Sequence, residues 1–508
     1  KGDVTGVSDG GTVLAKAGLQ TGQTDFQKGA LIDVSGGTKG GHGGFIELSA
    51  STVTWEGAFR AHAISGYRGG KLLIDPLFDE NSPITTGVLS GFTNQIIDSG
   101  LNDIELQSTG NLNVTARFDL SEWLLPQGQT GTLTFNAGQN LLFNNASIRN
   151  GDRGQGVAGS RWDYKLFANE HIEIKGSVLS TGAGGTITME AGRSPIAFGD
   201  IRLLQTGTSL PSQPVLETFA GGDITITTDR DLIAPSGLVQ ASVTGIRLNE
   251  QGNLTLNVGR DFLGGLVGNT KIGPGFLLGN GTATVKVGLN VGPGPTQHPT
   301  GGNIGSTDAY TNITVGGGRI DEDLALTEAF KTKISAEASG HIYWGIVQDR
   351  GLVEDVFQTG DPYILSHPDS SVSLLSSAGN IFLKPRLPNN PSGGIDVVRQ
   401  IYPASLDVQA PNGSITIESN LTFFPSVTGR LNFFAKNDIT GTTRITGFRK
   451  DPRFQLVYVG DTFPAGTWRL LDLQTAVNDP FLAQYITKVP PPAAQNSRPL
   501  ESSFSPQE

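Results

Sequence analysis

The sequence lacks cysteine and is poor in charge. It has no cysteine in 508 residues, which excludes disulfide bonds, thiolate zinc sites and thiol catalysis. Charged residues make up 16% of the chain, whereas a typical globular domain has about a quarter. The 36 basic and 47 acidic residues give a net charge of −11, and no cluster of Lys and Arg is present. Such a chain is poorly suited to nucleic acid or anionic membranes, so we expect no nucleic-acid partner.

Long apolar runs are missing as well. No stretch approaches the roughly 18 consecutive apolar residues of a membrane-spanning helix, so we expect a protein that does not span the membrane. The six histidines are scattered and lack the short spacing of metal ligands, and tandem calcium-binding nonapeptides are also missing. We therefore expect neither a metal nor a cofactor. The chain begins at Lys1 without a signal peptide, and we expect it to be a mature or excised portion of a longer protein.

Glycine, by contrast, is abundant and recurs in one phrase. The chain has 70 glycines, about twice the usual share. Glycine pairs stand directly before alternating runs at 35–50, 181–192 and 219–231. Alternation with a period of two sends Ile224 and Ile226 to one side of a strand and the threonines between them to the other. Short strands with one apolar face therefore recur along the chain, separated by turns of Gly, Asn and Asp.

A single strand of this kind has nothing to bury its apolar face against. Stacked coils solve the problem, because strands of neighbouring coils pair in parallel and their apolar faces line one continuous interior. The sequence therefore predicts an all-β solenoid with short loop or helical decorations and coils of roughly 20 to 25 residues. We expect six apolar side chains from separate repeats to point inward, namely Ile224, Ile226, Leu254, Leu256, Ile415 and Ile417.

The repeat rhythm divides the chain into five ranges. Strand repeats occupy 1–320 and 370–450, and an insertion with helical and aromatic segments occupies 321–369. In the insertion, "DEDLALTEAFKTK" (321–333) combines acidic residues at its start with good helix formers and predicts a short helix. Residues 451–488 are interpreted as a terminal cap, with a second helix predicted at 478–488. The proline-rich residues 489–508 are interpreted as an extended tail.

Two phrases near the start of the chain resemble a known family. "GALIDVSGGTKGGHGGFIELSA" (29–50) followed by "GYRGGKLLIDP" (66–76) is similar to the large filamentous haemagglutinin-like exoproteins of two-partner secretion systems. The resemblance implies a right-handed parallel β-helix, export through an outer-membrane transporter of the two-partner type, and an adhesin secreted or held on the bacterial cell surface. The family's amino-terminal secretion domain, with its Asn-Pro-Asn signature, is missing from the sequence, so the export route rests on the resemblance alone.

Polysaccharide hydrolases and lyases also adopt β-helices, but their signature residues are missing here. A glycosidase needs two or three acids about 5 to 9.5 Å apart, one of them protonated. His42 stands in a "GHGG" phrase like that of polygalacturonases, yet the acidic companion motifs of those enzymes do not occur. We interpret His42 as a polar corner residue, and Asp152 and the acidic run 321–323 as parts of solvated loops. We therefore expect no catalytic residue and no enzyme activity.

The segment 340–369 breaks the repeat rhythm and holds four aromatic residues, Tyr343, Trp344, Phe357 and Tyr363. Aromatic residues outside the coil pattern are enriched at contact surfaces, although a local side core or a cap would use them equally well. We interpret these four as the partner-binding residues. The expected partner is a surface glycan or protein, or neighbouring copies of the chain.

The leading hypothesis is a secreted or cell-surface β-helical adhesin or extracellular structural protein without enzyme activity. Two alternatives stay open. A carbohydrate-active β-helix enzyme would show close carboxylates in a deep groove. A subunit of an extracellular filament that stacks end to end would show an uncapped coil at each end.

Overall fold

The computed structural model is built almost entirely of β-strands. It describes residues 6–18, 21–76, 83–86, 88, 95–96, 98–120, 123, 125, 129–150, 160–204, 215–236, 238–239, 242–243, 245–267, 270–288, 301–315, 318–321, 324–329, 331–345, 347–349, 367, 369–384, 401–418, 421–423, 429–441 and 457–458. The chain forms two compact units, one of residues 1–233 with 290–297 and one of residues 234–289 with 298–508. Within each unit, strands of successive coils pair in parallel. The parallel β-helix predicted from the sequence is confirmed.

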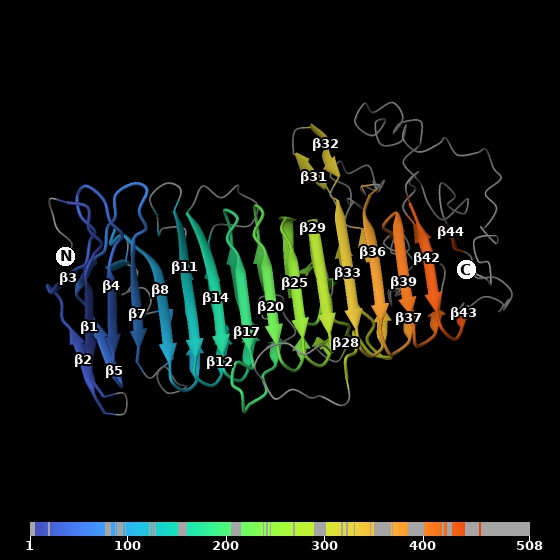
Figure 1. The fold of residues 1–508 in the computed structure, drawn as a ribbon, viewed down its shortest axis with the longest axis horizontal. Coiled ribbons are helices and arrows are strands. Elements are labelled where there is room, and N and C mark those ends of the chain that lie inside the picture. Colours follow the sequence, from blue (N-terminus) through green and yellow to red (C-terminus); the bar gives the residue numbers. More distant parts are fainter. Residues whose placement is uncertain are drawn as a thin grey trace. The chain divides into compact units, whose positions relative to one another are not determined.

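In the first unit, most coils pass through three strands, and the strands of successive coils form parallel sheets (Figure 1). The main sheet contains β1 (Thr12–Lys16), β4 (Phe45–Ser49), β7 (Gly70–Asp75), β8 (Leu101–Ser108), β11 (Thr130–Ala137), β14 (Arg161–Ala168), β17 (Ile187–Ala191) and β20 (Ile224–Thr228). The second sheet contains β9 (Leu112–Val114), β12 (Leu141–Asn144), β15 (Ile172–Lys175), β18 (Ile201–Leu204) and β21 (Leu232–Ile233). The third contains β10 (Arg117–Asp119), β13 (Ser147–Arg149), β16 (Val178–Thr181) and β19 (Val215–Thr218). In the first coils, β2 (Gln23–Phe26) pairs with β5 (Thr52–Trp55), and β3 (Leu31–Asp33) pairs with β6 (Ala58–Arg60).

The second unit repeats this arrangement. Its main sheet contains β25 (Leu254–Val258), β29 (Phe276–Val287), β33 (Thr332–Ala338), β36 (Ser371–Ser376), β39 (Ser405–Ala410) and β42 (Leu431–Ala435). The second sheet contains β34 (Ile342–Trp344), β37 (Ile381–Leu383), β40 (Ile415–Ile417) and β43 (Ile439–Gly441), and bridges through Ile304 lead to it from β26 (Phe262–Leu263). The third face contains β24 (Gly245–Gln251), the start of β29, β30 (Ile313–Val315), β35 (Val347–Asp349), β38 (Ile401–Tyr402), β41 (Leu421–Phe423) and β44 (Val457–Tyr458).

Three antiparallel hairpins lie outside the parallel sheets of the second unit. They are β22 (Leu238–Val239) with β23 (Ser242–Val243), β27 (Gly265–Val267) with β28 (Thr270–Ile272), and β31 (Gly318–Asp321) with β32 (Leu324–Ala329). The helix predicted at 321–333 is therefore wrong, because this range contains β32 and the first residues of β33. Helix propensity is a weak prior, and strand pairing between the two halves of the hairpin overrides it here.

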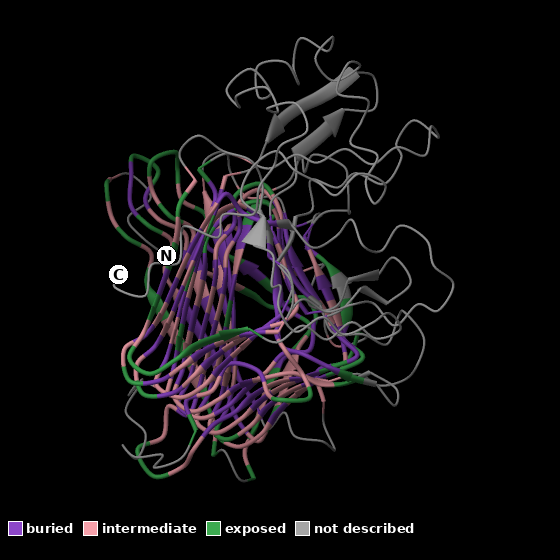
Figure 2. Cartoon of the chain, turned by 90° about the vertical axis from the view of Figure 1, so that its right-hand side faces the viewer, coloured by how far each residue is buried: buried purple, intermediate pink, exposed green. Residues whose placement is uncertain are grey.

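The core of each unit lies inside its coils, where alternate residues of most strands are buried (Figure 2). In β17 and β20 the burial alternates residue by residue, and Ile187 and Met189 pair in register with Ile224 and Ile226. The six side chains that the sequence places inside are all buried, with no more than 3% exposure for any of Ile224, Ile226, Leu254, Leu256, Ile415 and Ile417. Parallel pairing in register places the apolar side chains of one coil on those of the next, which builds the continuous apolar interior expected of a solenoid.

A ladder of polar corner residues joins successive coils of the first unit. The Asn111 side chain accepts a hydrogen bond of 3.2 Å from the backbone N–H of Asn140, and the Asn140 side chain accepts one of 3.1 Å from His171. The His171 ring then accepts one of 2.9 Å from Asp200, and the Asp200 carboxylate accepts one of 3.2 Å from Asp231. Each corner side chain thus satisfies a backbone donor of the next coil, which a buried turn requires.

The second unit has the same kind of ladder. Side chains of Asp261, Asn303, His341, Asn380 and Ser414 accept in turn from the backbone N–H of the corner residue one coil further on. Three of these hydrogen bonds are 2.8, 2.9 and 2.8 Å long, and they join Asn303 to His341, His341 to Asn380 and Asn380 to Ser414. The corner role that the sequence assigns to Asn and Asp is confirmed, and histidine takes the same role through Nδ1.

Glycine pairs stand where coils approach most closely. A Cβ on Gly69 would lie 2.0 Å from the carbonyl oxygen of Gly100, and a Cβ on Gly70 would lie 2.5 Å from the Cβ of Ala61. No side chain fits at such distances, so the repeated phrase of two glycines before a strand marks the corner at which the backbone enters the main sheet.

The coils are longer than the 20 to 25 residues expected. Hydrogen bonds between equivalent corners join residues 29 apart at Asn111 and Asn140, 31 apart at Asn140 and His171, and 38 apart at Asn303 and His341. Only in places, as between Asp407 and Asn432, is the separation 25. The strands set the minimum length of a coil, whereas loops between strands can lengthen without disturbing the pairing.

The boundaries of the predicted insertion are also wrong in part. Within 321–369, β33, β34 and β35 belong to the regular coil and pair with strands of neighbouring coils. Of the predicted cap at 451–488, the structure describes only residues 457 and 458, which form β44 and pair with β41. The helix predicted at 478–488 and the tail at 489–508 lie outside the described residues.

Candidate functional site: a polar groove on the main sheet

The aromatic residues singled out in the sequence do not form one surface. Tyr343 and Trp344 are neighbours in β34, where successive side chains point to opposite faces. Trp344 is buried, with 1% exposure, so the expectation that it meets a partner is wrong. The reason is the alternation itself, because Trp344 occupies an inward position of a regular coil strand. Phe357 and Tyr363 lie outside the described residues.

Tyr343 does lie on the outer face of β34, but its ring is engaged by neighbours. It stacks on Phe382 of the next coil with 4.9 Å between ring centroids and 6° between planes, and it meets the edge of Tyr310 at 5.6 Å. Tyr310 in turn donates a hydrogen bond of 3.0 Å to Glu418 and carries the Lys384 ammonium over its ring at 4.9 Å. This arrangement matches the local side core that the sequence also allows, because rings that stack on each other cover each other's faces.

His42 occupies a corner, as the sequence predicts. Its Nδ1 accepts a hydrogen bond of 2.9 Å from the backbone N–H of Arg68, and its own backbone N–H donates to Asp9 at 2.8 Å. The ring meets the edge of Tyr67 with 5.3 Å between ring centroids. The imidazole therefore positions the turn that carries Tyr67 and Arg68.

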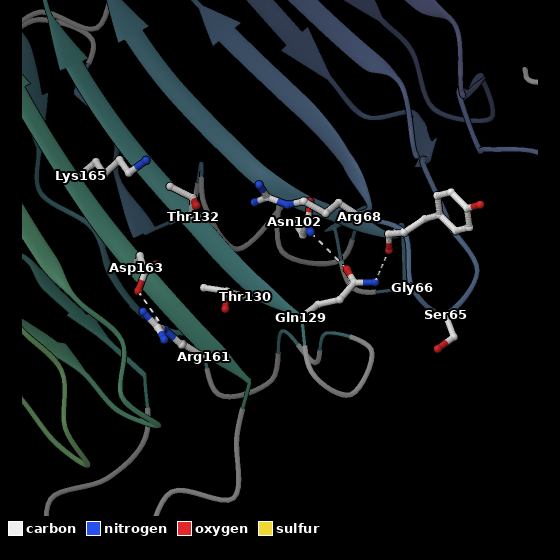
Figure 3. A pocket seen from close by; sticks show the side chains of 11 residues that line it. Ser65, Gly66, Arg68, Asn102, Gln129, Thr130, Thr132, Arg161, Asp163 and Lys165 are labelled. Carbon is white, nitrogen blue, oxygen red and sulfur yellow. Dashed lines mark hydrogen bonds and ion pairs between the residues drawn. The ribbon is translucent and has the colours of Figure 1, made fainter. Parts of the chain in front are cut away.

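That turn forms one wall of a groove on the outer face of the main sheet of the first unit (Figure 3). The groove has a volume of about 1030 Å³, at the upper end of the roughly 300 to 1,000 Å³ typical of small-molecule sites. From the turn come Ser65, Gly66, Tyr67 and Arg68. From β8, β11, β14 and the residue before β11 come Asn102, Gln129, Thr130, Thr132, Arg161, Asp163 and Lys165.

The strand residues reach the groove because of their alternation. In β14, Trp162 and Tyr164 are buried inside the coil with at most 1% exposure. Arg161, Asp163 and Lys165 therefore point outward. In the register of the sheet, β11 lies between β8 and β14. Thr130 and Thr132 accordingly form the floor between the charged side chains of β14 and the turn that carries Arg68 (Figure 3).

Gln129 holds the turn against the sheet. Its Oε1 accepts hydrogen bonds from Asn102 Nδ2 at 3.1 Å and from the backbone N–H of Gly69 at 3.4 Å, and its Nε2 donates to the carbonyl oxygen of Tyr67 at 2.9 Å. Gly66, with a φ of 90°, supplies the backbone geometry that the turn needs. One amide thus ties residues that are about 60 positions apart in sequence, and the groove wall is fixed before any ligand arrives.

The groove carries an excess of positive charge. Among the described residues, its lining contains the three cations Arg68, Arg161 and Lys165 and one carboxylate, that of Asp163. Asp163 is already engaged, because it lies 3.3 Å from Arg161 and accepts a hydrogen bond of 2.9 Å from the backbone N–H of Thr186. Within the described residues, the side chains of Arg68 and Lys165 have no carboxylate partner. The groove lining is therefore locally positive in a chain whose net charge is −11.

A group of carboxylates lies on neighbouring coils of the same sheet. Glu47 pairs with Lys16 at 2.7 Å, and Glu105 pairs with Lys71 at 2.8 Å. Burial, followed by the negative charges of Glu47 and Glu105, raises the pKa of Asp75 from 3.8 to about 6. A carboxyl group that keeps its proton near neutral pH is what a general acid requires, but the two flanking carboxylates are bound to lysines.

The described part of the chain contains neither a candidate metal site nor a candidate membrane-spanning helix. No group of three or more His, Asp or Glu side chains there could hold a metal ion. Among the same residues, no helix has the length and apolar character needed to cross a membrane.

The sequence did not predict the groove, although its pattern marks some of the residues that line it. Arg68 stands inside the quoted phrase at 66–76, and the alternation of Arg161, Asp163 and Lys165 marks them as an outward-facing charged row. What the sequence could not supply was the register that places residue 68 beside residues 129 and 161. Comparison with models of known protein families, with curated proteins and with solved structures finds no match for this chain.

Proposed function

We propose that the protein is a secreted or cell-surface adhesin, or an extracellular structural protein, that binds its partner without chemical conversion. The observation that carries the proposal is the groove on the main sheet, in which Arg68 and Lys165 face solvent without a carboxylate partner among the described residues. Coil residues are committed to packing and ladder bonds, so unpaired cations gathered over a rigid sheet are available for recognition. Among its described residues the groove lining supplies one carboxylate, whereas glycoside hydrolysis uses two.

The partner in this proposal is a surface glycan or protein. The resemblance of residues 29–76 to filamentous haemagglutinin-like exoproteins supports display at a bacterial surface or release from it, with export through an outer-membrane transporter of the two-partner type. The resemblance concerns the start of the chain, which includes the Tyr67 and Arg68 turn of the groove.

Attachment of the purified chain to cells or to glycan-coated surfaces tests the proposal. The double variant Arg68→Ala with Lys165→Ala should lose most attachment. The matched control, Lys175→Ala with Lys333→Ala, removes the same charge from exposed strand positions outside the groove and should attach as the wild type does. Circular dichroism of both variants shows that the strands remain. Equal attachment by all three proteins would disprove the proposed role of the groove.

One observation favours the carbohydrate-active enzyme as a second candidate. Asp75, with its raised pKa, lies within electrostatic reach of Glu47 and Glu105 on the two adjacent coils. If the protein hydrolyses a polysaccharide, new reducing ends should appear near pH 5 to 6 and should vanish in Asp75→Asn. Absence of product from a broad panel of acidic and neutral polysaccharides would remove this candidate.

A further inference from the structure

The described residues that line the groove are almost all polar or charged. Among them only Tyr67 has a large ring, and none has an aliphatic side chain. Thr130 and Thr132 offer hydroxyl groups along the floor, and the cations stand at both sides (Figure 3). A ligand with many hydroxyl groups and some negative charge would match both features.

The strands under the groove offer no open edge to a peptide. Peptides commonly bind to sheets by adding a strand to an open edge. In this groove β11 is paired on both sides, with β8 and with β14, and β14 is paired with β17 as well. Their backbone donors and acceptors are therefore used within the sheet. The described residues of the groove lining include no aliphatic side chain that could form an apolar pocket, the other feature of peptide recognition.

The geometry of the charges indicates which anion fits. Arg68 approaches from the turn and Lys165 from β14, on opposite sides of the threonine floor (Figure 3). Two separate cations fit a ligand with negative charges at intervals along its length better than they fit a single compact anion. Arg68 can also hold a carboxylate in a bidentate manner through its planar guanidinium group.

We infer that this groove binds an oligosaccharide carrying carboxylate groups, such as a run of uronic acid units. The inference rests on the proposed function and names its ligand class. The sugar hydroxyls are bound by Thr130 and Thr132, and the carboxylates are bound by Arg68 and Lys165. Gln129 acts as a positioning residue, because it fixes the turn of Tyr67 and Arg68 through three hydrogen bonds and so lowers the ordering cost of binding.

Titration calorimetry of the full chain with three probes tests the ligand class. The probes are a tetramer of galacturonic acid, a neutral tetramer of galactose and a tetraglutamate peptide. The acidic sugar should bind, with an affinity that falls as salt is raised, and the other two should bind at least about tenfold more weakly. Equal binding of the neutral sugar, or equal binding of tetraglutamate, would overturn the inference.

Variants locate the binding. Arg68→Ala and Lys165→Ala should each weaken binding of the acidic tetramer about tenfold or more, since each removes a hydrogen-bonding charge. Lys175→Ala should leave it unchanged. Gln129→Ala should weaken binding, and the binding that remains should keep its dependence on salt because Arg68 and Lys165 are still present. If Arg68→Ala and Lys165→Ala bind as the wild type does, the site lies elsewhere and the inference fails.

The attachment assay separates this inference from the proposed function. If the double variant loses attachment but the acidic tetramer neither binds nor inhibits, the groove is an adhesive site and the ligand class is wrong. If the tetramer binds in the groove and the double variant still attaches normally, the ligand class holds and the proposed role of the groove in attachment fails. Inhibition of wild-type attachment by the acidic tetramer alone is the result expected when both are correct.

Discussion

The carboxylate of Asp200 makes two hydrogen bonds, each of 2.6 Å, with the guanidinium of Arg230 from the next coil. A second guanidinium, that of Arg202, also donates to this carboxylate, and the backbone N–H of Asp231 adds a bond of 3.2 Å. Burial by itself would raise the pKa of Asp200, but these bonds outweigh it and lower the pKa from 3.8 to about 2. One corner side chain thus joins two coils through both charge and backbone.

The Asp200→Asn variant should be less stable by about 2 kcal/mol at pH 7, because two arginines lose their anionic partner. Since folding lowers the pKa of Asp200 to about 2, its contribution is present above about pH 4 and is lost as the pH falls through about 2. Urea unfolding at pH 7 and near pH 2 measures both values. A difference between variant and wild type that stays the same at the two pH values would contradict the assignment.

Asp75 should show the opposite dependence. Folding raises its pKa to about 6, so its contribution to stability is present below about pH 4 and is lost as the pH rises through about 6. Asp75→Asn should therefore stabilise the protein by about 1 to 2 kcal/mol at pH 8 and have little effect at pH 4. Thermal unfolding at the two pH values tests this, with Asp25→Asn, an exposed β2 position, as the control. A variant that is less stable at pH 8 would refute the raised pKa.

The corner histidine His171 makes the first unit sensitive to mild acid. Burial is the largest cause that lowers its pKa below 6.5, and its Nδ1 must stay unprotonated to accept from Asp200. Its contribution is therefore present above about pH 6.5 and is lost as the pH falls below that value. In His171→Asn, which copies the acceptor of Asn140, the loss of stability between about pH 7 and 5 should be smaller. Identical slopes in His171→Asn and the wild type would rule the mechanism out.

The inward and outward positions of β20 should differ sharply in how much a charged substitution destabilises the protein. Ile226 is completely buried and pairs in register with Met189, whereas Thr225 lies on the opposite face. Ile226→Asp buries an unpaired charge and should cost several kcal/mol, while Thr225→Asp should change stability by about 0.5 kcal/mol or less. Urea unfolding and limited proteolysis compare the two. Equal sensitivity of both variants would mean that the face assignment is incorrect.

The sequence predicted the local structure well where one rule decides it. Alternation with a period of two identified the inward faces of β20, β25 and β40, and glycine pairs identified the corners at which coils approach closely. The helix predicted at 321–333 failed because helix formers such as Leu324 and Ala329 were judged by propensity, while pairing between β31 and β32 decided the outcome. The same limit applies to Trp344, whose inward position follows from β34 being a coil strand.

The sequence by itself determined the repeating strand, the corner chemistry and the apolar interior of this protein, because each depends on residues a few positions apart. Coil length and the groove were decided by tertiary structure. Loops of any length can separate paired strands, so the residue that meets Thr132 on the next coil cannot be counted from a local pattern. Only the register of β8, β11 and β14 brings Arg68, Gln129 and Lys165 together over one floor. Contacts between distant residues arise from the pairing of whole strands, and that pairing exists only once the coils have stacked.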